Sequence, residues 1–314
     1  MGAYLVRRIL IALPVLAIIS FAVFGMTYLI PGDPARVLVG DHATPEQYAA
    51  IRHSLYLDRP FLSQFFHWIG NALTGSFGTS IQYHSHVGSD ITSRLPVTLS
   101  LAVGALFVTV LVGVPLGVAA GTRPGSLIDR SVAIGTSVGL AVPDFFIALL
   151  LIVAFAVHLH WFPAISYVNL TDDPVQWAYH LVLPWIALGI GNASTLARQL
   201  RSAMADAMEQ DYVRTARAKG LTRAMVTYKH ALKNASIAPL TVLGIQFAYL
   251  LGGSVIIEVF FGLPGIGNYY YLGLFNKDLP VIQGVTLLVA FTFIAMSIVV
   301  DAAYAFVNPK VRLA

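Results

Sequence analysis

The chain contains no cysteine, and charged residues make up only 11% of its 314 residues. Without cysteine there is no disulfide-stabilised fold, and cysteine usage gives no indication of a redox compartment. With 57% hydrophobic residues and a mean hydropathy of +0.75, the chain is too apolar for a soluble protein of this length. The composition therefore indicates a membrane protein.

Nucleotide-binding and catalytic motifs are also missing. No Gly is followed by Lys, so no P-loop can hold nucleotide phosphates, and no His-Glu-x-x-His occurs. The pairs His84/His86 and His158/His160 lack nearby further ligands, so we predict no metal site. No nucleophile–base pair or metal motif supports an intramembrane hydrolase. We therefore expect a chain that catalyses no reaction, binds no cofactor itself and takes energy from a partner.

Long apolar runs dominate instead. Six reach roughly the 20 residues that a helix needs to cross a bilayer core. The predicted fold is an all-α membrane protein, a single transmembrane domain over 1–314. The first span is expected to be retained, because Ile30–Asp33 is no signal-peptide cleavage site. The predicted spans are about 9–30, 97–121, 131–158, 181–201, 238–262 and 282–307.

Basic residues predict the orientation. Of the 19 Lys and Arg, 14 flank one side of the predicted spans and 5 the other. By the positive-inside rule, both termini and the loop 202–236 are cytoplasmic, and the segment 31–95 is external. The net charge of +4 thus needs no nucleic acid to explain it.

The external segment is predicted to form two short helices. One begins at Thr44-Pro45-Glu46, with Thr as cap, and one lies near Phe61–Leu73. Their aromatic residues are too few for an independent core. Two interpretations stay open: the aromatic residues pack on the outer ends of the spans, or the segment contacts an external partner. The aromatic residues are Phe61, Phe65, Phe66 and Trp68.

The loop 202–236 has a helical pattern. Met204, Met208, Tyr212, Ala216 and Gly220 recur every four residues, which predicts one helix with these residues along one face. Gly220 is expected to end it. Thr222 then caps a second helix, with Leu221 and Val226 as a hydrophobic staple. Small residues at the bend, Ala216 and Gly220, would let another protein approach closely.

Acidic residues within spans are costly, so Asp144, Glu258 and Asp301 are expected to face protein or a water-filled path. Pro143 should break the third helix, and Asp144 beside it lines a path or is a satisfied structural carboxyl. Glu258 holds the following turn, contacts a partner or lines the path. Asp301 is expected to be a structural or interface residue. The outward stretch with Gly262, Pro264, Gly265 and Gly267 is read as a tight re-entry turn.

Four stretches of this chain form a recognisable set. The first two are Leu5-Val-Arg-Arg-Ile through Pro31-Gly-Asp-Pro34, and Arg94-Leu-Pro-Val-Thr-Leu99 with Gly113-Val-Pro-Leu-Gly117 and Asp129-Arg130. The others are Asp211 to Leu221 with His230-Ala-Leu-Lys-Asn234, and Glu258-Val-Phe-Phe-Gly-Leu-Pro-Gly-Ile-Gly267 with Asp301 and Asn308-Pro-Lys310. Together they resemble one family, the B-type permease subunit of bacterial dipeptide/oligopeptide ABC importers. The similarity is collinear and covers nearly the whole chain; the loop 202–236 and the Glu258–Gly267 stretch are its specific parts.

The resemblance implies six helices of the type I ABC importer permease fold, in the cytoplasmic membrane. It implies a path shared with a homologous C-type permease, two ATPases that bind ATP and Mg, and an extracytoplasmic peptide-binding protein. The loop would dock on an ATPase, although Arg214 and Thr215 replace the Glu and first Ala of the general importer pattern. The implied coupling residues are Tyr212, Arg214, Thr215, Ala216, Arg217, Lys219, Gly220 and Leu221.

The sequence thus predicts a non-catalytic permease subunit that imports di- or oligopeptides, with Asp144 and Glu258 as path or gate candidates. Within the same class, nickel chelates, glutathione or another small solute stay open as substrates. From another class, the chain could be a stand-alone secondary transporter or channel, which would need no ATPase-docking surface.

Overall fold

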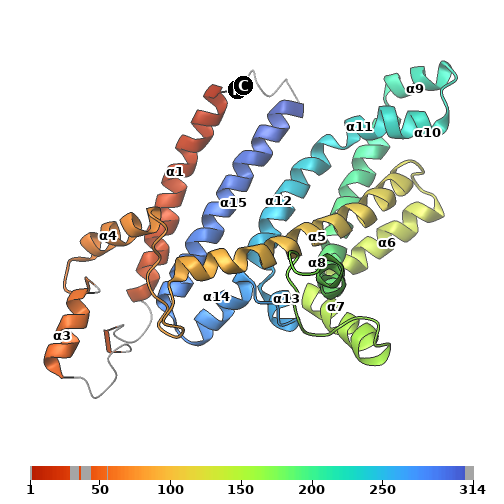
Figure 1. The fold of residues 1–314 in the computed structure, drawn as a ribbon. Coiled ribbons are helices and arrows are strands. Elements are labelled where there is room, and N and C mark those ends of the chain that lie inside the picture. Colours follow the sequence, from red (N-terminus) through yellow and green to blue (C-terminus); the bar gives the residue numbers. More distant parts are fainter. Residues whose placement is uncertain (1, 29–34, 37–43, 55, 308–314) are drawn as a thin grey trace. The chain divides into compact units, whose positions relative to one another are not determined.

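The computed structural model describes residues 2–28, 35–36, 44–54 and 56–307, and its regular elements there are helices apart from an isolated β-bridge between Thr79 and His86 (Figure 1). The family-like stretches Pro31–Pro34 and Asn308–Lys310 lie outside the described residues. The helices of the first half are α1 Gly2–Gly25, η1 Met26–Tyr28, α3 Pro45–Ser54, α4 Phe61–Leu73, α5 Val87–Gly121, α6 Leu127–Ala141, α7 Asp144–Leu151 and the π-helix η2 Ile152–His158. Those of the second half are α8 Pro174–Met208, α9 Asp211–Ala218, α10 Arg223–Met225, the π-helix η3 Val226–Ala231, α11 Leu232–Ala235, α12 Ile237–Gly253, α13 Val255–Phe260, α14 Ile266–Phe275 and α15 Leu279–Val307.

Among the described residues, four helices are long and apolar enough to cross a membrane, or up to six if each bent helix pair is one span. The bent pairs are 127–158, with an angle of 97°, and 223–253, with 59°. Most helices extend beyond the predicted apolar runs. For example, α8 begins at Pro174, where the Asp173 carboxylate caps it by accepting from Val175 N and Gln176 N.

Two predicted spans are interrupted. As expected, α6 ends at Ala141 and Pro143 stands at the N-cap of α7, because proline cannot donate the hydrogen bond that continuation requires. The predicted span 238–262 is not one helix either. It breaks at Ser254, whose side chain donates a hydrogen bond to Glu258 at 3.0 Å.

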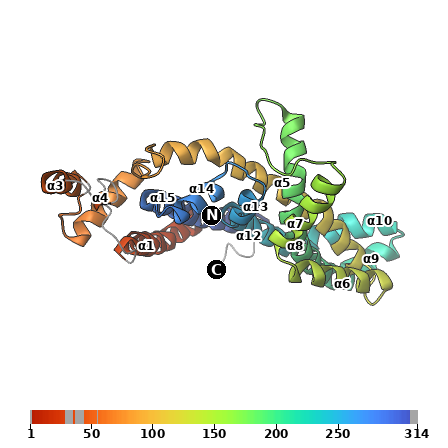
Figure 2. The same ribbon diagram turned by 90° about the horizontal axis from the view of Figure 1, so that it is seen from below.

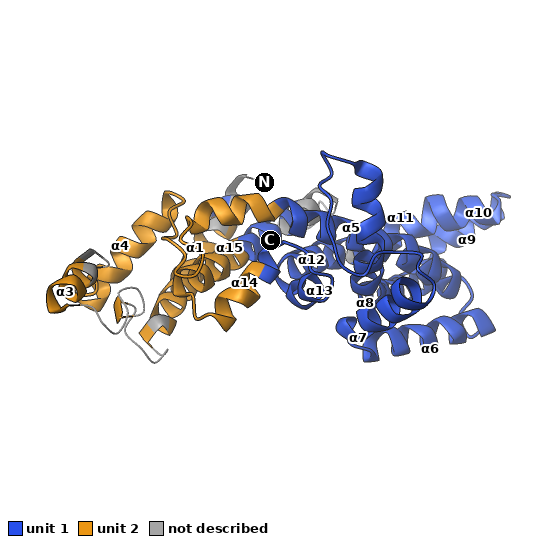
Figure 3. Cartoon of the chain, turned by 60° about the horizontal axis from the view of Figure 1, so that its bottom comes forward, with its two compact units in different colours: residues 1–6, 96–268, 292–314 blue, residues 7–95, 269–291 orange. Residues whose placement is uncertain are grey.

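The chain forms two compact units, coloured in Figure 3. The first comprises residues 1–6, 96–268 and 292–314. In it, α8 packs against α6, α7 and α12, and α6, α7 and α8 lie together in both Figure 1 and Figure 2. Its larger core joins α5, α7, α8, α12 and α13 through buried residues such as Leu101, Ala148, Leu188 and Leu250.

Glycines let α5 approach α8 closely within this unit. A Cβ added at Gly113 would lie 3.0 Å from the carbonyl oxygen of Ala193, and one added at Gly117 would lie 2.8 Å from Leu200 Cβ. The four-residue spacing places both glycines on one helix face, the small-residue pattern by which membrane helices pack closely. The C-terminal half of α5 therefore packs on α8 without intervening side chains from α5.

The second unit comprises residues 7–95 and 269–291. The predicted helices are confirmed: α3 begins after Thr44, whose hydroxyl accepts from Gln47 N at 3.3 Å, and α4 spans Phe61–Leu73. The α4 rings pack on the end of α1; Phe65, for example, lies 5.4 Å from Phe21 between ring centroids. Phe61 and Trp68 also contact α1, whereas Phe66 is 66% exposed. The packing interpretation is therefore confirmed for three of the four aromatic residues.

Candidate functional site

The loop 202–236 is a packed structure at one end of the first unit, where α9 and α10 lie in Figure 1. Buried Val213 and Ala216 of α9 belong to one apolar cluster with Leu200 and Met204 of α8 and Val118 of α5. Val226, Ala231 and Ala235, from the second half of the loop, complete the buried set. The loop is thus fixed to the C-terminal ends of α5 and α8 by apolar contacts.

The predicted bend is confirmed in its details. Gly220 has φ of +77°, a left-handed conformation that glycine adopts without penalty. The Thr222 side chain then accepts from Met225 N, so it caps the second helix. Leu221 and Val226 belong to the same apolar cluster, as the staple requires.

The single helix predicted through Met204 and Gly220 is wrong. The chain leaves the helix after Met208, and Gln210 takes an extended conformation with ψ of 149° before α9 begins at Asp211. Because of this break, Tyr212 does not continue the face of Met204 and Met208, and it is exposed. Val213, which lies off the predicted stripe, is fully buried in its place.

The surface of the bend differs accordingly from the predicted one. Ala216 is only 5% exposed and faces the cluster, so its side chain is not available to a partner. The exposed small residues are Thr215, Ala218 and Gly220. Exposed cations surround them: Arg214, whose side chain is 72% exposed and lies 3.5 Å from Asp211, together with Arg217, Lys219 and Arg223.

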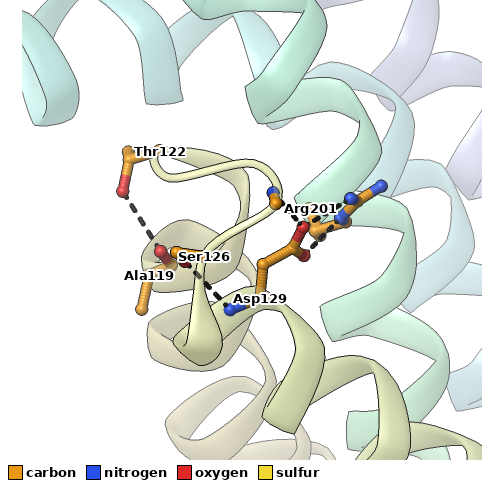
Figure 4. Close-up of polar contacts among 6 residues, drawn as sticks. Ala119, Thr122, Ser126, Asp129 and Arg201 are labelled. Carbon is orange, nitrogen blue, oxygen red and sulfur yellow. Dashed lines mark hydrogen bonds and ion pairs between the residues drawn. The ribbon is translucent and has the colours of Figure 1, made fainter.

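A bidentate ion pair lies next to this loop (Figure 4). Arg201 of α8 donates from Nε and a terminal guanidinium nitrogen to the two Asp129 oxygens, both at 2.7 Å. Asp129 also accepts from Gly125 N at 2.9 Å, and its own N–H donates to the Ser126 cap. The pair therefore fixes the turn between α5 and α6 to the end of α8.

Sequence reasoning did not identify this pair, which joins residues 72 positions apart. The local signal was a Ser126 cap followed by an acid three residues on, a helix-start pattern. That pattern places Asp129 in a first turn but indicates no partner for it.

Glu258 lies at the centre of a buried polar network. Its carboxylate accepts from the Thr98 hydroxyl at 2.8 Å, from Ser254 at 3.0 Å and from Asn268 N at 2.9 Å, and the residue is fully buried. Gly265 and Gly267 lie so near that a Cβ on either would crowd the carboxylate. This geometry supports the interpretation that Glu258 holds the turn.

The same turn contains the other predicted structural residues. Gly262 has φ of +60° and Pro264 follows it in the turn between α13 and α14. A Cβ at Gly262 would lie 2.6 Å from Ile165 Cγ2, so the turn also approaches the 159–173 segment closely. Asp301 lies on α15, and its side chain is outside what the structure describes.

Asp144 is the first residue of α7, at the 97° break, and is partly buried. Its Oδ1 would lie 3.0 Å from a Cβ built on Gly191, so the carboxylate rests against α8 where that helix has no side chain. The structure thus brings Asp144 to the middle of α8 and keeps it apart from the loop residues.

These features define a multi-helix membrane subunit with a packed loop at one end of its bundle. Residues 113–313 match the family described as binding-protein-dependent transport system inner membrane component, and residues 1–102 match the N-terminal part of such components. The chain belongs to this family of multi-pass membrane proteins and is the permease component of an ABC importer.

Similar proteins carry related names. The chain is 40% identical over 312 residues to a putative peptide transport system permease protein of Brucella abortus (strain 2308), covering 99% of each chain. It is 38% identical to a probable peptide ABC transporter permease protein of Sinorhizobium fredii, covering 99% of this chain and 100% of the relative. It is also 38% identical over 309 residues to the glutathione transport system permease protein GsiC of Salmonella typhimurium, covering 98% of each.

A solved structure confirms the fold. A chain of the MetNI methionine ABC transporter in an inward-facing conformation matches with a TM-score of 0.57 at 19% identity, covering 69% of this chain and 96% of that one. At this identity the match concerns the fold alone. The predicted all-α fold of the type I ABC importer permeases is thereby confirmed.

Proposed function

We propose that this chain is a permease subunit of an ATP-driven importer of di- and oligopeptides. It shares the solute path with a second, homologous permease, and two ATPase subunits bind the loop side of the pair. The ATPases bind ATP and Mg, and this chain catalyses no covalent step. An extracytoplasmic binding protein delivers the peptide, and both termini and the loop 202–236 are cytoplasmic.

The packing of the loop carries this proposal. A solvated connection between spans needs no buried core, whereas Val213 and Ala216 are buried in the same apolar cluster as Leu200 and Met204 of α8. Displacing α9 would therefore move the end of α8 with it. This is the mechanical property that coupling to a nucleotide-driven partner requires.

The exposed part of the bend suits docking. Thr215, Ala218 and Gly220 present little side chain, so a groove could approach the backbone closely. Arg214 and Arg217 beside them offer guanidinium groups for carboxylates on the partner. Tyr212, Lys219 and Leu221 complete the proposed coupling surface, while Ala216 supports it from inside.

Peptides are favoured as the solute because the relatives from Brucella and Sinorhizobium are named for peptide transport. Glutathione is the second candidate, supported by the similarity to GsiC. The two candidates share one chemistry, since glutathione is itself a small peptide.

Two glycines allow a matched test of coupling. Gly220 and Gly125 have nearly the same φ, +77° and +76°, and a Cβ on either meets nothing within 4 Å. Replacing either with Leu therefore imposes the same backbone strain, on the order of 1–2 kcal/mol. Only Gly220, however, lies on the proposed docking surface.

We expect Gly220→Leu to insert normally but to lose most peptide-stimulated ATP hydrolysis in the reconstituted transporter, and Gly125→Leu to keep it. Copurification of the ATPases with each variant shows whether docking itself is lost. Equal activity of the two variants would contradict docking at the bend. ATP-independent uptake by the chain alone would favour a stand-alone carrier.

A further inference from the structure

In the first unit, three side chains on α7, α8 and α12 carry a hydrogen-bond acceptor that receives no donor from the described residues. Gln246, midway along α12, is only 8% exposed. Its Nε2 donates to the Asn192 carbonyl oxygen at 3.2 Å, which fixes the orientation of the amide because a carbonyl can only accept. Its Oε1 therefore faces away, and it is buried with no donor among the described residues.

Asn192 contributes the second acceptor, near the midpoint of α8. Its Nδ2 donates to the Leu188 carbonyl oxygen at 2.8 Å, so its orientation is fixed in the same way. Within the described part of the chain, no donor contacts its Oδ1. Where α8 and α12 meet, the amide nitrogens of Asn192 and Gln246 both donate to backbone carbonyl oxygens, and both amide oxygens are left without a donor among the described residues.

Asp144 contributes the third acceptor and the only charge. Its carboxylate lies against Gly191, the residue before Asn192. None of the described residues donates a hydrogen bond to it or forms an ion pair with it. Arg198 lies on α8 about two helical turns after Gly191. Its guanidinium donates a hydrogen bond to the Ser137 hydroxyl at 3.4 Å instead.

The chemistry of the unused groups is therefore one-sided. All three unpaired groups at this place are hydrogen-bond acceptors, and the carboxylate of Asp144 supplies their negative charge. In helices of this length and apolarity, such groups are expensive unless water, a ligand or another chain satisfies them. A group that satisfies all three must donate several hydrogen bonds and carry positive charge. Ammonium and guanidinium groups both do so, and the ammonium is the one that every peptide with a free amino terminus carries.

We propose that Asp144, Asn192 and Gln246 form a subsite of the solute path that binds the ammonium group of the solute, such as the amino terminus of a peptide. The inference rests on the proposed function and adds to it the chemical class that the path selects. Anionic solutes are repelled at the same place, because the site holds no donor to pair with them.

The absence of cysteine makes a direct test possible, since a single introduced cysteine is the only thiol in this chain. Thr195→Cys places it one turn from Gly191, because the Thr195 hydroxyl donates to the Gly191 carbonyl oxygen. Labelling rates are measured in membrane vesicles that contain the assembled transporter. The two reagents are thiosulfonates of similar size, one with an ammonium and one with a sulfonate.

We expect the ammonium reagent to react faster, and Asp144→Asn to reduce the ratio of the two rates by about fivefold, as one nearby charge predicts. Asp206→Asn removes an exposed carboxylate elsewhere and should leave the ratio unchanged. The inference would be overturned if Asp144→Asn left the ratio of the two labelling rates unchanged, or if neither reagent reacted with the thiol. Ala141→Cys, at an exposed position beside the break, gives a second reporter if Thr195→Cys does not fold.

A second measurement tests whether a solute with an ammonium group protects the introduced cysteine from labelling. Dialanine amide carries a free ammonium and no carboxylate, and should slow labelling by at least threefold; its N-acetylated form should not. Equal protection by both compounds, or by neither, would overturn the subsite. Labelling needs no nucleotide, so a transporter that does not couple to ATP would still report on this site. Failure of the proposed function and failure of the proposed subsite can therefore be distinguished.

Discussion

The contact between α5 and α8 allows a quantitative prediction. Gly117 lies inside α5, and a Cβ there would be 2.8 Å from Leu200 Cβ and 2.9 Å from the Ala197 carbonyl oxygen. Carbon atoms in contact are normally about 3.5–4.0 Å apart, so Gly117→Ala forces the helices apart by about 1 Å. Overpacking of this kind costs about 1–3 kcal/mol.

Gly135→Ala is the matched control, because Gly135 also lies inside a helix but has nothing within 4 Å of an added Cβ. Both substitutions gain helix propensity of about 1 kcal/mol, which cancels in the comparison. The two variants should therefore differ by about 1–3 kcal/mol in the free energy of unfolding, with Gly117→Ala the less stable. Thermal unfolding of the detergent-solubilised transporter measures this, and equal melting temperatures would refute the close-approach argument.

Two further predictions concern buried polar contacts. Glu258→Leu leaves the Asn268 N–H without its acceptor, which should destabilise the chain by about 1–3 kcal/mol and lower its melting temperature; unchanged melting would refute the turn-holding role. Arg201→Ala should make the turn between α5 and α6 more sensitive to protease, because the carboxylate loses both guanidinium bonds. Adding Asp129→Ala should restore part of the resistance, and a double variant no better than the single one would contradict the pairing.

Local chemistry explains how much was predictable. The Gly220 turn, the Thr222 cap and the Pro143 break follow from backbone preferences that each residue carries itself, and all three are present. The spans followed from apolar composition, although helix ends such as the start of α8 lie beyond the apolar run because a polar cap sets them. Sequence could therefore give the class of fold and the position of the bend.

Features set by tertiary packing were not predictable. The interruption at Gln210 has no proline or glycine to announce it, and the four-residue stripe continued across it. Burial of Val213 in place of Tyr212 follows from where α8 and α5 lie, which one helix cannot show. The partner of Asp129 and the free oxygen of Gln246 likewise depend on residues distant in sequence.

The interruption after Met208 has a mechanical consequence. Because the backbone ladder of α8 does not continue into α9, a displacement of α9 cannot travel as the motion of one rigid rod. The displacement must be transmitted by the apolar side chains of the cluster. The ion pair between Arg201 and Asp129 also transmits it to the turn between α5 and α6. The stiffness of this joint is thus set by how tightly apolar side chains pack, and substitutions within the cluster would change it without altering the exposed bend.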